Sequence, residues 1–360
     1  MTNDEKLVAA RARIDALDES IQRQISERAQ IAQDVARIKA DMGEGADCYR
    51  PSREAEVLRR VAERNTGPLT NQTIVRVMRE IMSACLSLES PLEIAYLGPE
   101  GTYTQAAVYK HFGNAVKARP LAAIDEIFRD VEAGNADYGV VPVENSTEGV
   151  VNHTLDMFAT SSLLICGEVS LPVHHHLLAR EGEVGEVREV YAHSQSFAQC
   201  RQWLDRKLPG AERVIVASNG EGARMAAEVG GAAIAGKAAA DRYGLKILAA
   251  NIEDEPDNTT RFLVIGRQIV APSGNDMTSI LLSSHNRPGA LYALLRPFSD
   301  AGVNLTRIES RPSRRAQWDY NFFVDIEGHA QTAEIKAVLD GMRDDAAFFK
   351  FLGSYPRAVV

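Results

Sequence analysis

The feature that most constrains this chain is a long amphipathic repeat near its N-terminus, from about Leu7 to Ala40. Apolar residues recur there at steps of three to four residues, with occasional wider gaps, which predicts one continuous α-helix. They are Ile14, Leu17, Ile21, Ile25, Ile31, Val35 and Ile38. A helix of this length cannot be covered by the first 90 residues alone. A partner chain is the simplest way to bury its apolar face, so we expect a homodimer or a higher homo-oligomer.

The rest of the first 91 residues also has a helical pattern. Residues 41–51, DMGEGADCYRP, interrupt the first helix. A second helix follows through Leu58 and Val61 to Asn65, and a third runs from about Asn71 to Leu88. Because Pro91 closes this region, we expect residues 1–91 to form an all-α domain.

Two further units follow along the chain. Between Ile94 and Ile269 short apolar strands alternate with helical segments, which is typical of an α/β domain with largely parallel strands. The span is long enough for two lobes, and we assign residues 92–271 to this domain. The segment 271–277, APSGNDM, is rich in turn-forming residues and marks a boundary. After it, residues 275–357 have the order βαββαβ, which predicts an α+β ferredoxin-like sandwich.

Composition excludes several classes of protein. The 360 residues carry a formal net charge of −9, which argues against nucleic acid or an anionic membrane as a partner. No apolar run approaches the roughly 18 residues of a membrane span, and the N-terminus has no secretory-signal pattern. The four cysteines, Cys48, Cys85, Cys166 and Cys200, have neither disulfide nor zinc spacing. We therefore expect a cytoplasmic protein.

The helical region is rich in arginine. It carries 14 basic residues, and 12 of them are Arg, which binds carboxylates bidentately and could hold a dicarboxylate. The alternative is a solvated face on which arginines pair with acidic neighbours. Arg28 and Lys39 are three helical turns apart and share a face. Arg11 is rotated by roughly 100° from Arg28, so it would serve another site, such as one completed across a dimer.

One set of residues in this region resembles the all-helical type of chorismate mutase, an intertwined dimer: Arg11, Arg28, Lys39, Arg53, Glu54, Cys85 and Glu89. The resemblance implies that Arg11 reaches into the partner's site, and that Arg28 and Arg53 hold the two carboxylates of chorismate. It implies also that Lys39 donates to the ether oxygen as that atom gains negative charge. A Claisen rearrangement requires only such positioning and a hydrogen-bond donor at the developing oxyanion.

Three positions depart from that family pattern. Glu89 stands where a Gln usually donates to the ether oxygen, and Cys85 stands where a Ser is usual. Arg50 stands where an Asp is often found, and its role is open. Glu89 can donate only when it is protonated, so we expect the mutase to work best at mildly acidic pH, or Glu89 to have a raised pKa.

In the middle domain several strand ends lead into a polar loop and then a helix. These loops lie at residues 98–107, 144–149, 193–200 and 236–237. Helix N-termini bind anions, and the carboxyl edges of parallel strands are where α/β proteins keep ligands, so we expect a cleft for a small carboxylate. Helix capping alone is the alternative for each loop. The string GPEG lacks the spacing of a P-loop, which disfavours nucleotide binding.

Five strings together resemble prephenate dehydratase, whose fold is like that of the two-lobed periplasmic binding proteins: GPEGTYTQAA, VVPVENSTEG, HHHLL, AHSQSFAQC and DNTTRFLVIG. The resemblance implies that Thr260 protonates the leaving hydroxyl while prephenate loses CO2. It places Asn145 and Gln199 in the cleft, with Glu144, Ser146 and Thr147 flanking it. Arg261 supports the site or forms a structural ion pair.

The three successive histidines, His174, His175 and His176, invite a metal-site interpretation. On a strand His175 would face away from the other two, and no acidic or Cys partner stands at ligand spacing. We therefore favour a structural role and predict no metal and no other cofactor.

The last domain carries two further motifs. NRPGALYALL and TRIESRPS resemble those of ACT domains attached to prephenate dehydratases. The resemblance implies a phenylalanine site at Gly289, Ala290, Leu291, Asn304, Glu309 and Ser310. The alternative is a purely structural dimerisation module.

Taken together, the three resemblances predict a multidomain enzyme under feedback inhibition by phenylalanine. Its all-α mutase domain would turn chorismate into prephenate, and its two-lobed dehydratase domain would turn prephenate into phenylpyruvate. One alternative is a dehydratase with an impaired mutase, because Cys85 and Glu89 depart from the pattern. The other is a non-catalytic amino-acid sensor built from a binding-protein fold and an ACT domain.

Overall fold

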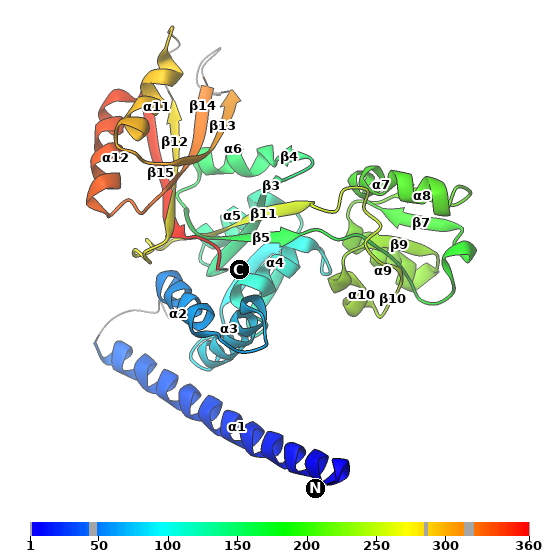
Figure 1. Ribbon diagram of the computed structural model, residues 1–360. Helices are drawn as coiled ribbons and strands as arrows, with labels where there is room; N and C mark the ends of the chain where they lie inside the picture. The colour runs from blue at the N-terminus through cyan, green and yellow to red at the C-terminus, as the bar shows by residue number, and fades with distance from the viewer. Residues whose placement is uncertain (1, 43–48, 284–286, 313–319, 360) are drawn as a thin grey trace.

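The computed structural model describes residues 2–42, 49–283, 287–312 and 320–359 of the chain. Cys48, Asn286 and Ser313, which belong to segments discussed above, lie outside the described residues. Figure 1 shows three units in chain order: a helical region, a two-lobed α/β region and a smaller α/β sandwich. The three-part architecture predicted from the sequence is confirmed.

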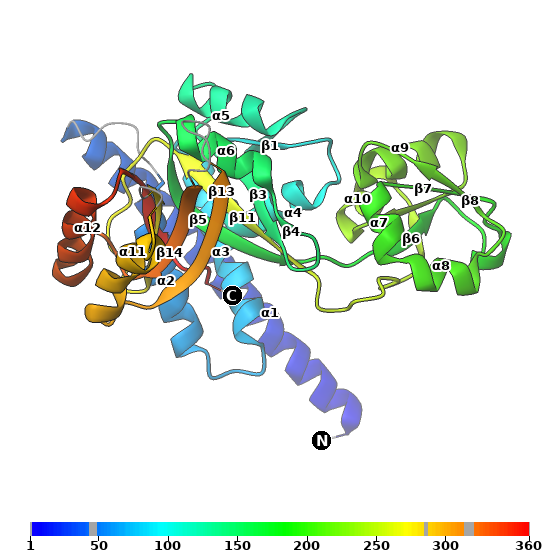
Figure 2. The ribbon, with the colours of Figure 1, turned by 90° about the horizontal axis from the view of Figure 1, so that it is seen from above.

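The N-terminal unit consists of α1 (Asn3–Asp41), α2 (Pro51–Arg64) and α3 (Asn71–Ser87). Proline opens α2 at a position that suits its fixed φ, and the Thr70 side chain caps α3 by accepting from the Thr73 N–H. α1 packs against α3 but projects from the body as a rod in both views (Figures 1 and 2). Its predicted apolar stripe faces solvent, with Leu17 62% exposed and Ile38 58% exposed.

The first lobe of the middle domain is one sheet with the strand order β2-β1-β3-β11-β5, and β4 pairs with β3. Its strands are β1 (Glu93–Leu97), β2 (Lys117–Leu121), β3 (Tyr138–Asn145), β4 (Gly149–Val150), β5 (Leu164–Pro172) and β11 (Thr259–Gly266). Its helices are α4 (Tyr103–Phe112), α5 (Ile124–Glu132) and α6 (Asn152–Thr160).

The second lobe has the strand order β10-β6-β9-β7-β8 and stands apart from the other units in both ribbon views (Figures 1 and 2). Its strands are β6 (His176–Ala179), β7 (Glu189–Ala192), β8 (Glu212–Ile215), β9 (Ala232–Ala235) and β10 (Lys246–Ala249). Its helices are η1 (Val184–Glu186), α7 (Ser194–Gln199), α8 (Arg201–Lys207), α9 (Asn219–Val229) and α10 (Lys237–Tyr243).

The prediction of largely parallel strands is confirmed, with one reversed strand in the main path of each sheet. In the first lobe β11 is antiparallel to both β3 and β5, and in the second lobe β6 is antiparallel to both β9 and β10. The connectivity explains the direction of β11, because β5 carries the chain out to the second lobe and β11 brings it back. A strand that returns along the same axis must run opposite to the one that left.

The C-terminal unit has the predicted βαββαβ order. It comprises β12 (Asp276–Ser283), α11 (Ala290–Asp300), β13 (Leu305–Pro312), β14 (Tyr320–Glu327), α12 (Ala333–Asp345) and β15 (Phe348–Pro356). The sheet order is β13-β14-β12-β15. Ile280 and Leu282 pack under the two helices, whereas Leu281 points to the opposite face and joins a core with the first lobe. The sandwich therefore shares one apolar core with the α/β domain.

Buried cysteines are spread over the units of the fold. Cys85 lies in α3, Cys166 in β5 and Cys200 at the end of α7, and all three are buried. Within the described residues no helix is both long enough and apolar enough to cross a membrane.

Candidate functional site

A cleft of about 720 Å³ is lined by residues of both lobes of the α/β domain. Thr260 on β11 and Asn145 on β3 lie directly opposite each other in the sheet register, and both line this cleft. His175, which precedes β6, lines it as well, and Gln199 at the end of α7 contributes from the second lobe. The cleft therefore gathers polar side chains from segments that are far apart in the sequence.

The Thr260 hydroxyl is oriented by its neighbour across the ladder. Asn145 Nδ2 donates to Thr260 Oγ1 at 2.8 Å. Asn145 Oδ1 accepts from the backbone N–H groups of Thr147 and Glu148, both at 3.1 Å, so its amide group has a defined orientation. Because the Thr260 oxygen already accepts from Asn145, its own proton is left to donate to a ligand in the cleft.

Gln199 links the two lobes across the cleft. Its Nε2 donates to Thr147 Oγ1 at 2.9 Å, and its Oε1 lies 2.8 Å from His175 Nε2. On the other side of the imidazole, the hydroxyl of Tyr103 lies 2.9 Å from His175 Nδ1. Burial lowers the pKa of His175. Tyr103 and His175 were not among the predicted site residues, although both stand inside strings that the family resemblance covers.

Two helices point their N-termini at the cleft. Thr102 caps α4 and Ser218 caps α9, and both capping residues also line the cleft. Helix N-termini carry partial positive charge, so this end of the cleft favours an anion such as a carboxylate.

The remaining predicted dehydratase residues do not line the cleft. Ser146 Oγ accepts from the Thr259 N–H at 2.9 Å and ties the loop to β11. Glu144 and Arg261 are the next ladder pair after Asn145 and Thr260, and neither lines the cleft. Both face the C-terminal sandwich, where Glu144 pairs with Arg307 at 2.7 Å and Arg261 pairs with Asp325. Arg261 also pairs with Glu168 of β5 in its own lobe. Of the two roles that the sequence left open for Arg261, the structure shows the structural ion pair.

The histidine run is not a strand over its length, because His174 and His175 precede β6 and only His176 belongs to it. His174 Nδ1 lies 2.8 Å from Glu253 Oε1, an acidic partner that the sequence spacing did not reveal. Among the described residues, no cluster of three or more His, Cys, Asp and Glu side chains could hold a metal ion.

The predicted mutase residues are dispersed over the helical unit. Arg11 is exposed on α1, and Arg28 and Lys39 are half-buried on the same helix. Arg53 is an exposed residue whose Nη1 lies 3.0 Å from Glu56 Oε2. Cys85 is buried in α3, and Glu89 is half-buried just beyond it. None of these six side chains lines the cavities described here.

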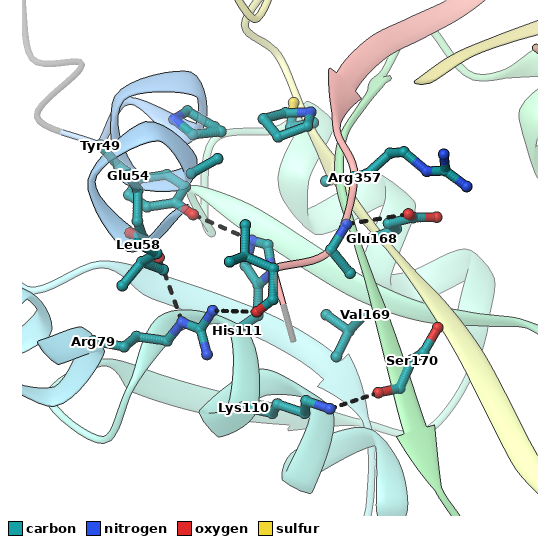
Figure 3. Close-up of a pocket in the computed structure, with 17 residues that line it drawn as sticks. Tyr49, Glu54, Leu58, Arg79, Lys110, His111, Glu168, Val169, Ser170 and Arg357 are labelled. Atoms are coloured by element: carbon teal, nitrogen blue, oxygen red, sulfur yellow. Dashed lines mark hydrogen bonds and ion pairs between the residues drawn. The ribbon is translucent and has the colours of Figure 1, made fainter. Parts of the chain in front are cut away.

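Glu54 instead lines a small cavity of about 50 Å³ where all three units meet (Figure 3). Its Oε1 lies 3.7 Å from Arg79 Nε, and burial raises the pKa of Glu54 to about 7 although Arg79 acts to lower it. Arg79 in turn donates to the backbone oxygen of Val359 at 3.4 Å, in the segment that follows β15. Lys110 donates to Ser170 O at 2.9 Å on the opposite wall. The cavity is too small for an organic substrate.

The predicted effector residues lie on the C-terminal unit. Gly289 has φ +75° and caps α11, a conformation that favours glycine, and Ala290 and Leu291 begin that helix. Asn304, just before β13, and Ser310, within β13, are exposed. Glu309 is half-buried between the sheet and the first lobe.

The fold and the cleft define a class of protein: a two-lobed α/β enzyme of binding-protein architecture, joined to a helical domain and a ferredoxin-like domain. Three family models match the chain in this order. They are chorismate mutase type II over residues 10–90, prephenate dehydratase over 94–269 and the ACT domain over 278–343.

Curated relatives match over the full length. The chain is 55% identical to a bifunctional chorismate mutase/prephenate dehydratase of Pseudomonas aeruginosa, with all of both chains covered. It is 49% identical to one of Neisseria gonorrhoeae, with 100% of this chain and 99% of the relative covered. Among solved structures it is similar to a prephenate dehydratase from Arthrobacter aurescens in complex with L-Phe. That match has 37% identity and a TM-score of 0.69, and it covers 75% of this chain and 93% of the other.

The chain belongs to the bifunctional chorismate mutase/prephenate dehydratase family. The predicted family and the two predicted enzyme classes, isomerase and lyase, are confirmed. The alternative of a non-catalytic sensor is not favoured, because the full-length relatives are bifunctional enzymes. The alternative of a dehydratase with an impaired mutase is not favoured for the same reason.

Proposed function

We propose that this chain converts chorismate to prephenate in its helical domain and prephenate to phenylpyruvate in the cleft between the lobes. Phenylalanine acts as a feedback inhibitor at the ACT domain. The observation that carries the dehydratase assignment is the Thr260 hydroxyl, held by Asn145 with its proton free to donate into the cleft.

Thr260 is the proton donor in the dehydratase step. Prephenate carries carboxylates and a ring hydroxyl, and the reaction releases CO2 and water to form an aromatic ring. The electron pair of the breaking C–CO2 bond moves into the ring and expels the hydroxyl, which leaves as water with the proton of Thr260. A proton from solvent then restores the Thr260 hydroxyl. The N-termini of α4 and α9 favour the substrate carboxylates, and Asn145 holds Thr260 in place.

The mutase site is completed in a homodimer. In a single chain Arg28, Lys39 and Arg53 have the positive charge needed for a dicarboxylate, but they lie on helices whose exposed surfaces form no cavity among those described. The exposed apolar stripe of α1 supports pairing with a second chain, which would bring Arg11 into the partner's site. Arg28 and Arg53 then bind the carboxylates, and Lys39 donates to the ether oxygen.

Phenylalanine binds at the residues that follow β12 and lie along β13, namely Gly289, Ala290, Leu291, Asn304, Glu309 and Ser310. The similar prephenate dehydratase of Arthrobacter aurescens was solved with L-Phe, which supports this effector. The bifunctional enzyme relatives and the cysteines without disulfide spacing support action in the cytoplasm.

The test is to incubate the pure protein with chorismate alone at about pH 7.5 and follow chorismate loss and phenylpyruvate formation together. We expect phenylpyruvate to appear, and added phenylalanine to suppress it. Chorismate that persists while added prephenate is converted would contradict the mutase assignment. Prephenate that persists would contradict the dehydratase assignment.

A further inference from the structure

Strands β3 and β11 line the cleft with one face and contact the C-terminal sandwich with the other. Thr260 and Asn145 form one ladder pair and line the cleft, and Arg261 and Glu144 form the next pair. Side chains alternate along a strand, so the second pair points away from the cleft. The β13 strand of the C-terminal sandwich lies on that side, where Glu144 Oε2 is 2.7 Å from Arg307 Nη1.

A second ion pair joins β13 to the same lobe. Arg311 Nη2 donates to both carboxylate oxygens of Asp156 in α6, at 2.9 and 3.0 Å. Residues of β13 alternate between half-buried and exposed, and Arg307, Glu309 and Arg311 share the half-buried face. The strand therefore contacts the dehydratase lobe at two points that are four residues apart.

These two points are the ends of one cleft-forming segment. Glu144 and Asp156 bracket a stretch whose Asn145, Glu148 and Val151 line the cleft. Other contacts of this segment run to β3 and β11, such as Thr154 Oγ1 donating to Pro142 O at 2.6 Å and Ser146 Oγ accepting from the Thr259 N–H at 2.9 Å. The contacts of β13 are thus ion pairs from another domain that act on the segment carrying Asn145.

Two arginines at the junction of the lobe and the sandwich, Arg261 on β11 and Arg307 on β13, differ in how many of their nitrogens have hydrogen-bond partners. Arg261 donates to Glu168, Asp325 and the Tyr355 hydroxyl, so all three of its nitrogens have partners. Both terminal nitrogens of Arg307 are buried without a directed hydrogen bond, although Glu144 is close. Arg261 is therefore a fixed anchor, whereas the Arg307 contact depends on the exact position of β13.

We infer that Arg307 and Arg311 are positioning residues for the dehydratase reaction. By holding Glu144 and Asp156, they set the position of Asn145 against Thr260. This inference rests on the proposed function and deepens it, because Glu309 and Ser310 of the proposed effector site lie between the two arginines. Phenylalanine bound there displaces β13, and the ion pairs transmit that movement to the catalytic threonine.

The test compares Arg307→Met and Arg311→Met with Arg307→Lys. The control is Arg296→Met, which removes an exposed arginine that pairs with Asp300 within α11. The full-length enzymes are assayed for dehydratase kcat and KM, for mutase rate on the same chain, and for inhibition and binding by phenylalanine. Binding is measured directly by calorimetry.

For both Met variants we expect dehydratase kcat to fall about tenfold with KM changed less than twofold, because small displacements of a catalytic group act on the chemical step. Mutase rate should stay within twofold, and phenylalanine should still bind but inhibit less completely. Arg307→Lys should recover most of the kcat, and Arg296→Met should match the wild type. Glu144→Gln combined with Arg307→Met should be no worse than either single change.

The inference is overturned if the Met variants keep wild-type kcat and full inhibition, or if mutase and dehydratase rates fall together as in a folding defect. Additive losses in the double variant would also overturn it. Failure of the proposed function would look different, since the wild-type protein itself would then leave prephenate unconverted.

Discussion

At the scale of single residues, the proposed chemistry of the cleft depends on the Thr260 hydroxyl and the Asn145 amide. Thr260 accepts from Asn145 and makes no other side-chain hydrogen bond among the described residues. Replacing it with Val keeps the shape and removes the proton, so we expect Thr260→Val to lower dehydratase kcat by about 10²–10⁴-fold. Thr260→Ser, which keeps the hydroxyl, should retain more activity.

Rates of phenylpyruvate formation from prephenate, measured for each variant, check this prediction. The mutase rate of the same chain is the internal control and should not change. A Thr260→Val enzyme within tenfold of the wild type would show that the proton comes from elsewhere.

A second residue makes stability depend on pH. Burial raises the pKa of Glu54 to about 7, so the native state binds its proton more tightly than the unfolded chain does. The stability from the neutral form is complete below about pH 4.5, and it is lost as the pH rises to about 7. We expect Glu54→Gln to be more stable than the wild type at pH 8, by up to about 3 kcal/mol, with the difference vanishing near pH 4.5.

Urea unfolding at several pH values measures that difference. Glu56→Gln is the matched control, because Glu56 is a more exposed carboxylate on the same helix. Equal behaviour of the two variants across the pH range would contradict the assignment of the proton to Glu54.

Sequence motifs located some of these residues but not their contacts. Asn145, Gln199 and Thr260 were predicted in the cleft, and all three line it. The ion pair between Glu144 and Arg307 joins residues 163 positions apart, so no local pattern could indicate it. Glu54 was expected in the mutase site from the family pattern, whereas its place at the domain junction depends on residues of α3 and on the segment after β15.

At the scale of elements, β15 lies on β5 with no room for a side chain at one point. Gly353 has φ +144°, and a Cβ there would overlap the backbone of Ile165. Backbone cannot move aside as a flexible side chain can, so we expect Gly353→Ala to destabilise the protein by at least about 2 kcal/mol. Gly341 in α12 meets open space, and Gly341→Ala should stabilise that helix by about 1 kcal/mol.

The melting temperatures of the two variants provide the measurement. We expect them to shift in opposite directions from the wild type. If Gly353→Ala melts at or above the wild-type temperature, β15 does not lie on β5 as described.

Periodicity predicted most elements but missed β2 and β6. β2, with the sequence KARPL, lies at the edge of its sheet and is largely half-exposed, so it has no apolar run to reveal it. β6 is fully buried, but it begins at His176, and the three successive histidines there do not form an apolar run that would indicate a strand. Strand direction depends on the path between the lobes, which residue patterns do not encode.

At the scale of the whole molecule, the exposed apolar stripe of α1 supports the proposed pairing with a second chain. Its apolar residues are exposed, so we expect Leu17→Lys to weaken the dimer and to lower mutase activity more than dehydratase activity. Sedimentation across a range of concentrations measures the assembly. Gln30→Lys, about 140° away around the helix axis, is the control and should leave assembly unchanged. A Leu17→Lys protein that assembles like the wild type would contradict dimerisation through α1.

The order of the three units could be predicted because each has its own periodicity and a boundary rich in turn-forming residues. The core that the dehydratase lobe shares with the C-terminal sandwich could not be predicted from the sequence. Leu281 and Phe323 of the sandwich pack with Phe158 and Ile165 of the lobe. The apolar pattern of each domain is nevertheless one that a separate domain would also show. The two domains should therefore melt as one unit.

The buried thiols make the opening of the helical unit and of each lobe measurable without a mutation. Cys85, Cys166 and Cys200 report respectively on the helical unit, the first lobe and the second lobe. Burial raises the pKa of the Cys200 thiol, so it reacts slowly while the second lobe is closed. Each thiol becomes accessible to an alkylating reagent when its own unit opens. Peptide mass spectrometry of a labelling time course would thus resolve which part of the native enzyme opens first, and whether bound phenylalanine slows that opening.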